Sequence, residues 1–340
     1  MATDFSNSPS SAVSECAARG ADKNRLAKPP AFTDFTRPFL GPFTYRTMFT
    51  GTYTAIVTPF KRNGEIDEAA LEALVKAQVK GKVDGVVPVG TTGESPTLGF
   101  DEHKRVVELT VRAANGRIKV MAGTGANSTE EAIELTRSAE ECGADGSLQV
   151  CPYYNKPTQE GLYQHFRSIA RSTRLPIVLY SIPGRSVISI AVDTVVRLAQ
   201  DCKNIVGIKE AGGDADRVSQ LRQALGPSFS ILSGDDALTL PFMSVGADGV
   251  ISVASNIVPG EISKMVKAAN AGKFTAAQKF HFKYYPLFKD LFVETSPGPV
   301  KAAMAMIGAI GENYRLPMTK IEKGNRAQLR KTMKACGILK

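Results

Sequence analysis

One lysine in the sequence stands where a buried strand would not normally carry charge. Lys209 follows a short apolar run in the stretch NIVGIKEAGG, residues 204–213. At the end of a buried strand, desolvation disfavours the ammonium form and lowers the pKa of a lysine. The neutral amine is a nucleophile that forms a Schiff base with a ketone. The alternative is a lysine on the rim, with its charge in solvent or paired with Glu210, and position alone favours neither.

Further polar groups follow other predicted strands. The turn GTTGES, residues 90–95, lacks the lysine of a P-loop and the spacing of a dinucleotide fingerprint. Its backbone N–H groups and the hydroxyls of Thr91 and Thr92 suit a carboxylate, although a tight turn capped by threonine explains it equally well. Tyr180 ends an apolar strand, where it relays a proton or simply lies on a rim. Arg185 follows a Pro-Gly turn and offers a guanidinium fork to a carboxylate, or else is a solvated loop residue.

Short apolar runs alternate with amphipathic segments from residue 51 onward, which predicts strands alternating with helices. Helix 67–82 has apolar residues at helical spacing, and Ser128 begins another helix that closes at Gly143. Eight such repeats predict a (β/α)8 TIM barrel with additional C-terminal helices. A doubly wound sheet is the alternative, which the missing G-x-G-x-x-G disfavours. The predicted strands are 52–59, 85–90, 118–125, 146–152, 176–183, 205–209, 229–234 and 249–255.

The chain divides into three predicted parts. Residues 1–50 are rich in Ser, Pro and Gly and predict a disordered or loosely ordered extension. A transit peptide would take the protein to a plastid, but the acids in this segment argue against it, and a start codon assigned before Met48 is the simpler alternative. Residues 51–255 form the predicted barrel, and residues 256–340 a helical region.

The composition narrows the function further. A formal net charge of +9 arises from 42 basic and 33 acidic residues that are scattered along the chain, so nucleic-acid binding is not expected. No apolar run is long enough to span a membrane. The five cysteines and three histidines are too isolated to predict disulfides or a metal site.

Six segments, taken together and in order, resemble the dihydrodipicolinate synthase family of pyruvate-dependent class I aldolases. The resemblance covers about residues 51–340 and rests on GTTGES, PYYNKPTQEGLYQHF, VLYSIPGRS, GIKEAGG, LSGDD and GVISVASN. It implies a lyase that condenses pyruvate with L-aspartate 4-semialdehyde through a lysine Schiff base, in lysine and diaminopimelate biosynthesis, without a metal or organic cofactor. It also implies a homotetramer, built as a dimer of dimers. The sparse, odd set of cysteines indicates reduced thiols in a cytoplasmic protein.

The resemblance also implies roles for individual residues. Lys209 matches the lysine that forms the imine, and Tyr180 the tyrosine that shuttles protons. Thr92 and Tyr154 match the relay partners of that tyrosine, Tyr154 across a dimer interface. Thr91 and Thr92 match the turn that holds the pyruvate carboxylate, and Arg185 matches the residue that binds the carboxylate of the semialdehyde. Gly234 and Ile251 match backbone positions that line the site. Ser181 and Ser186 replace the Asn and Thr that are common in the family, with little expected consequence.

The family's feedback site for lysine is a further implication. It maps to Ser95, Pro96, Phe100, His103, Asn127, Glu131 and Tyr153. Phe100 and Pro96 depart from the bacterial pattern of a histidine and a small residue. We therefore expect lysine to inhibit, without predicting how strongly.

Two other functions are weighed against the synthase: another pyruvate-dependent aldolase, of the N-acetylneuraminate lyase or sugar-acid type, and a non-catalytic barrel. The four residues Lys209, Tyr180, Thr92 and Arg185 disfavour the second.

Overall fold

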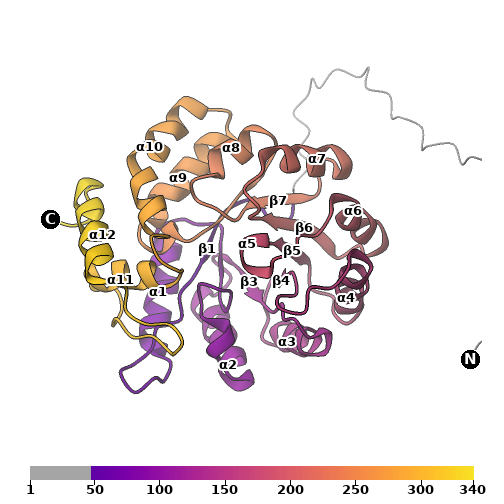
Figure 1. The fold of residues 1–340 in the computed structure, drawn as a ribbon, viewed down its shortest axis with the longest axis horizontal. Coiled ribbons are helices and arrows are strands. Elements are labelled where there is room, and N and C mark those ends of the chain that lie inside the picture. Colours follow the sequence, from indigo (N-terminus) through magenta and orange to yellow (C-terminus); the bar gives the residue numbers. More distant parts are fainter. Residues whose placement is uncertain (1–46) are drawn as a thin grey trace, which may run out of the picture. The chain divides into compact units, whose positions relative to one another are not determined.

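Eight parallel strands form a closed barrel at the centre of the molecule, in the computed structural model that describes residues 47–340. Each strand pairs with the next, and β8 pairs with β1, as the view along the barrel shows (Figure 1). The (β/α)8 fold is therefore confirmed, and the doubly wound alternative is wrong. The strands are β1 (Gly51–Ala55), β2 (Gly85–Val87), β3 (Lys119–Gly123), β4 (Gly146–Val150), β5 (Ile177–Ser181), β6 (Ile205–Glu210), β7 (Ser230–Ser233) and β8 (Gly249–Ser252).

Several strands are shorter than the sequence predicts, especially at their carboxyl ends. The run predicted as 52–59 forms a strand only to Ala55, yet Ile56 and Val57 remain fully buried in the following loop. An apolar run therefore marks burial here, and periodicity alone does not show where strand pairing ends.

Helices surround the barrel and cover the outer faces of the strands (Figure 1). The predicted N-cap is confirmed, because the Ser128 side chain accepts a hydrogen bond from the backbone N–H of Glu131. The helices between strands are α1 (Glu68–Lys80), α2 (Phe100–Ala114), α3 (Thr129–Glu141), α4 (Gln159–Arg171), α5 (Pro183–Ser186), α6 (Val192–Asp201), α7 (Ala215–Leu225) and α8 (Thr239–Ser244), with the 3-10 turns η1 (Ser95–Thr97) and η2 (Ala254–Asn256).

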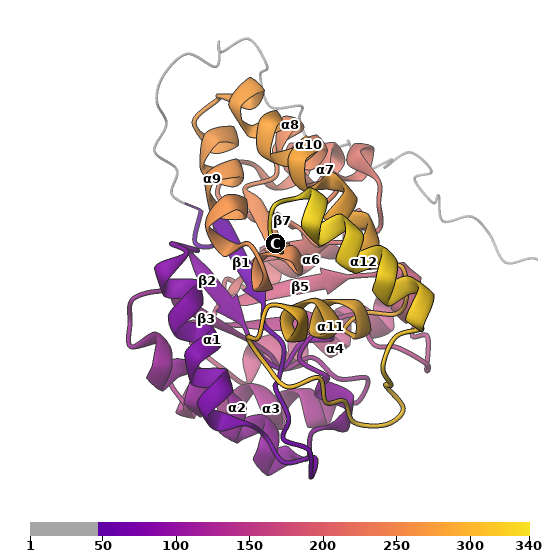
Figure 2. The ribbon, with the colours of Figure 1, turned by 90° about the vertical axis from the view of Figure 1, so that its left-hand side faces the viewer.

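Four more helices follow the last strand and lie together on one side of the barrel (Figure 2). Helix α9 packs on β1 and η2, α10 on α9 and α12, and α11 on α12 and η2. They are α9 (Pro259–Asn270), α10 (Phe274–Asp290), α11 (Gly298–Met306) and α12 (Lys323–Ala335). No helix within residues 47–340 is long and apolar enough to cross a membrane.

The barrel has two apolar cores, because successive side chains of a strand point to opposite faces. The larger core lies between the strands and the helices. The smaller core fills the barrel interior and contains Phe49, whose ring meets that of Tyr53 edge to face at 5.9 Å. Phe49 is fully buried although it precedes β1 and falls within the predicted extension. Residues 1–46 of that extension lie outside the described residues.

Candidate active site

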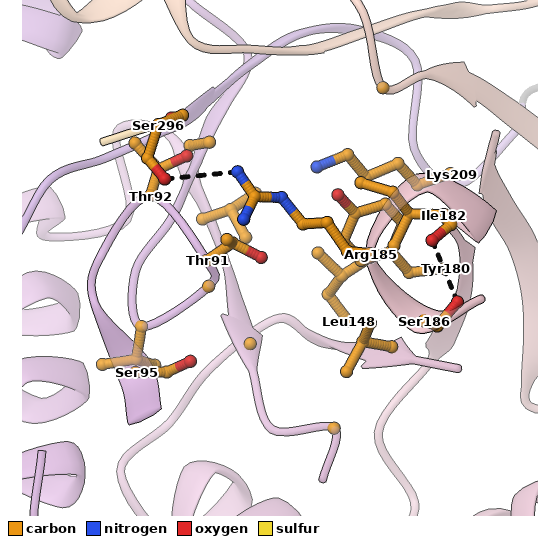
Figure 3. Close-up of a pocket in the computed structure, with 18 of the residues that line it drawn as sticks. Thr91, Thr92, Ser95, Leu148, Tyr180, Ile182, Arg185, Ser186, Lys209 and Ser296 are labelled. Atoms are coloured by element: carbon orange, nitrogen blue, oxygen red, sulfur yellow. Dashed lines mark hydrogen bonds between the residues drawn. The ribbon is translucent and has the colours of Figure 1, made fainter. Parts of the chain in front are cut away.

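A cavity of about 260 Å³ opens at the carboxyl ends of the barrel strands. Its lining comes from several strand ends and also from the C-terminal region, through Phe292 and Ser296. Ser296 lies beside Thr92 in the close-up (Figure 3). The sequence-predicted residues that line it are Thr91, Thr92, Tyr180, Arg185, Lys209 and Gly234, together with Ser95, Pro96 and Tyr153 of the expected lysine site.

Lys209 places a buried amine in this cavity. It lies on β6 beside Tyr180 of β5, and its Nζ is 4.0 Å from the centre of the Tyr180 ring. Burial lowers the pKa of Lys209 to about 7; the charge of Asp236 opposes this shift and that of Arg185 adds to it. The alternative of a solvated lysine paired with Glu210 is not what the structure shows, because Glu210 binds Arg217 at 2.7 Å.

Asp236 is a buried acid that the sequence analysis did not assign. Its carboxylate accepts hydrogen bonds from the Ser252 hydroxyl at 2.5 Å and from the backbone N–H groups of Val253 and Ala254 at 2.9 Å. Burial raises its pKa to about 6, although these hydrogen bonds oppose the shift. Its negative charge raises the pKa of Lys209 and thereby limits the effect of burial on the amine. The second aspartate in LSGDD was the only signal for it in the sequence.

Tyr180 presents a neutral phenol to the cavity. Burial raises its pKa, while the charge of Arg185 and the side chain of Thr91 lower it. Thr91 and the expected relay partner Thr92 both line the cavity.

The turn at residues 90–95 is held by its own backbone. The N–H groups of Gly93 and Glu94 donate to the carbonyls of Gly90 and Thr91 at 3.0 and 3.1 Å. The hydroxyl of Thr58 donates to the carbonyl of Gly93 at 2.7 Å and ties the turn to the loop after β1. These hydrogen bonds fix the conformation within the turn.

Arg185 lies in the short helix α5, on the opposite wall of the cavity from this turn (Figure 3). Its guanidinium donates to the backbone carbonyl of Ser296 at 3.2 Å. This contact spans 111 residues of sequence, so no local pattern could have predicted it.

Gly234 allows the chain to approach Lys209 closely. A Cβ atom at this position would lie 2.6 Å from the Cβ of Ala211 and 3.0 Å from the Cε of Lys209. Any larger residue would therefore push against the amine-bearing side chain. Ile251, predicted as another lining position, is packed in the barrel interior and is not among the residues that line the cavity.

Tyr154 lies outside the cavity of the single chain. It is 89% exposed and has a φ of +73°, a backbone conformation that non-glycine residues rarely adopt. Its predicted role requires a second copy of the chain.

Ser95, Pro96 and Tyr153 of the expected lysine site line the cavity, whereas its other residues are not part of the lining. The Asn127 side chain donates to the backbone carbonyl of Tyr153 at 3.1 Å. Burial raises the pKa of Tyr153, and the negative charge of Glu131 adds to this shift. His103 is buried, with its Nε2 3.0 Å from the carbonyl oxygen of Gly123, and burial lowers its pKa. Phe100 is 40% exposed at the start of α2.

Known proteins resemble this chain over most of its length. The model of the dihydrodipicolinate synthetase family matches residues 48–336. A 4-hydroxy-tetrahydrodipicolinate synthase of Aquifex aeolicus is 50% identical over 287 residues, which are 84% of this chain and 97% of the relative. The solved structure of that enzyme from Methylacidiphilum fumariolicum is 56% identical, with a TM-score of 0.84, over 85% of this chain and 96% of the other. A lysine-bound structure from Cyanidioschyzon merolae is 43% identical, with a TM-score of 0.84, over 86% and 100% of the two chains.

Proposed function

The chain belongs to the dihydrodipicolinate synthetase family and has 4-hydroxy-tetrahydrodipicolinate synthase activity, and on this premise we propose which residues perform each step. The enzyme is a lyase that acts on pyruvate and L-aspartate 4-semialdehyde through a lysine Schiff base. Curated relatives at about 50% identity carry this name, which argues against the two rival functions, a sugar-acid aldolase and a non-catalytic barrel.

We assign the Schiff base to Lys209. Its neutral amine attacks the ketone carbon of pyruvate, and loss of water gives the imine. The protonated imine withdraws electrons, so a methyl proton leaves and an enamine forms. The enamine carbon then bonds to the aldehyde carbon of the second substrate. Finally, the amine of that substrate adds to the imine carbon, displaces Lys209 and closes the six-membered ring.

Tyr180 is the proposed proton carrier for these steps. Its phenol is protonated at neutral pH because burial raises its pKa, so it can donate a proton to the oxygen that leaves as water. Thr92 remains the expected relay partner, and Thr91 is a second hydroxyl that could pass the proton onward, because its side chain acts on the pKa of Tyr180. Tyr154 of a second copy would extend the relay.

Two sites bind carboxylates in the proposed mechanism. The turn at residues 90–95 binds the carboxylate of pyruvate through backbone N–H groups and threonine hydroxyls. Arg185 binds the carboxylate of the semialdehyde, since its guanidinium lines the cavity and reaches only one backbone carbonyl within the described residues. The Arg185 guanidinium extends from α5 toward Ser296 and the two threonines of the turn, with Lys209 and Tyr180 beside it (Figure 3).

The observation that carries this assignment is the buried amine of Lys209, whose pKa lies near 7. Borohydride reduction in the presence of pyruvate should attach the three-carbon adduct to Lys209, as peptide mass mapping would reveal. The rate of trapping at low pyruvate should rise with pH through about 7, because the neutral amine is the reactive form and its fraction increases as the proton is lost. An adduct on any other lysine, or none, would refute the assignment.

We also propose that the active unit is a tetramer built from tight dimers. The exposed Tyr154, in its strained backbone conformation, supports an interface at this loop. A residue so placed contributes to catalysis only when a second copy covers it.

Feedback by lysine is proposed at the edge of the cavity, around Asn127, Glu131 and Tyr153. Lysine should inhibit the enzyme, and Phe100→His should lower the half-inhibitory concentration by about threefold to tenfold, because the imidazole adds a hydrogen bond that phenylalanine cannot make. Steady-state titration with lysine measures both effects, and Phe100→Leu serves as the apolar control. No inhibition of the parent enzyme at millimolar lysine would contradict the proposal.

A further inference from the structure

The carboxylate-binding turn carries a buried acid on the side away from the cavity. Glu94 follows Thr91 and Thr92, is only 3% exposed and has a φ of +57°. Its side chain is absent from the cavity lining. A buried carboxylate is costly unless it is paired and hydrogen-bonded, so its partners determine how the turn is held.

The partner of Glu94 is Lys301 of helix α11. The Lys301 ammonium donates to one carboxylate oxygen of Glu94, and both side chains are almost completely buried. The Lys301 Nζ also lies 4.4 Å from the centre of the Phe60 ring and 5.3 Å from that of Tyr314. Burial lowers the pKa of Lys301, and the charge of Glu94 opposes this shift.

A second attachment holds the same turn from the following segment. The backbone N–H of Arg315 approaches the other carboxylate oxygen of Glu94 at 3.4 Å. The Arg315 guanidinium donates to the carbonyl of Thr97 at 2.7 Å and to both carboxylate oxygens of Glu102 at 2.6 and 2.7 Å. The turn and the start of α2 are therefore fixed to the C-terminal region.

The C-terminal region also contacts the opposite wall of the cavity. The carbonyl of Ser296, five positions before Lys301, accepts the hydrogen bond from Arg185 (Figure 3). One short stretch, residues 296–301, thus contacts Arg185 directly and holds the turn through Glu94. Its geometry sets the spacing between the two proposed carboxylate sites.

We propose that the Glu94–Lys301 ion pair is a positioning device for pyruvate, which holds the turn at residues 90–95 in the orientation that accepts the carboxylate. The inference rests on the proposed role of that turn. An ion pair that only stabilised the fold would affect unfolding without affecting pyruvate selectively, and buried pairs are often poor stabilisers compared with apolar residues of similar size.

The test is the double variant Glu94→Gln/Lys301→Met, which removes both charges and retains similar volumes. Its KM for pyruvate should rise about tenfold, while kcat and the KM for the semialdehyde should stay within about threefold, because a displaced turn weakens binding of one carboxylate. The pyruvate concentration for half-maximal borohydride trapping should rise by the same factor. The single variant Lys301→Met should have a lower melting temperature than the double variant, because it leaves the buried carboxylate of Glu94 unpaired.

The matched control is the pair Arg222–Asp248, joined at 2.8 Å and partly buried next to the start of β8. Arg222→Met/Asp248→Asn should lower the melting temperature and leave the KM for pyruvate unchanged. If the double variant does not fold, Glu94→Gln alone carries the test, and its KM for pyruvate should again rise. Its amide oxygen still accepts a hydrogen bond from Lys301, which supports folding, but the ion pair is lost.

Two results would overturn the inference. One is a variant that melts at a lower temperature but binds pyruvate like the parent enzyme. The other is an equal rise in the pyruvate KM when the control pair is removed, because the effect would then follow from stability alone. If the parent enzyme itself forms no pyruvate adduct, the proposed role of Lys209 fails instead, and the two failures are distinguishable.

Discussion

Lys209→Ala is expected to reduce the rate of condensation by a factor of about 10⁴ or more, because the reaction loses its covalent intermediate. The loss should appear in kcat and should not be recovered at high pyruvate. Borohydride with pyruvate should leave no adduct on the variant. Steady-state kinetics and intact-protein mass measure the two effects.

The same substitution should not damage the fold. Lys209 is a buried amine whose charged form is disfavoured by desolvation, so its removal eliminates that penalty. The melting temperature should therefore be equal to or above that of the parent enzyme. Lys203→Ala is the matched control, because Lys203 is exposed just before β6 and should keep full activity. More than about 1% residual activity in Lys209→Ala would assign the nucleophile to another group.

The sequence was sufficient to predict the barrel and the residues at its strand ends. Eight apolar runs with intervening amphipathic segments specify a parallel sheet, and chemistry in a barrel lies at the carboxyl ends of the strands. Lys209, Tyr180 and the turn at residues 90–95 could be predicted for this reason. Their position depends only on the order of the strands, which the sequence displays directly.

The supporting contacts could not be predicted, because they join residues far apart in the chain. Glu94 meets Lys301 across 207 positions, and Arg185 meets Ser296 across 111. A lysine within an apolar helix gives no indication of which acid it will face. Asp236 was missed for a related reason, since its effect on Lys209 arises from burial and charge and not from spacing.

Tyr180→Phe is the second substitution with a large expected effect. It removes only the phenolic oxygen, so kcat should fall by a factor of about 10² to 10³ as general acid–base catalysis is lost. The KM for pyruvate should change little, because the turn that binds its carboxylate remains in place. Lys209 should still form an adduct, because its amine lies over the Tyr180 ring and phenylalanine retains that ring. The adduct should form more slowly, because the proton-donating hydroxyl is gone.

Tyr163→Phe provides the matched control for this hydroxyl. Its phenol donates to Asp201 at 2.6 Å on the outer helices, and it is absent from the cavity lining. Both variants lose one tyrosine hydroxyl, but only Tyr180→Phe removes one that a reacting group can reach. A kcat for Tyr180→Phe within about threefold of the parent value would show that water or another side chain carries the proton. A large fall that spares imine formation would instead place Tyr180 in the later, ring-closing steps.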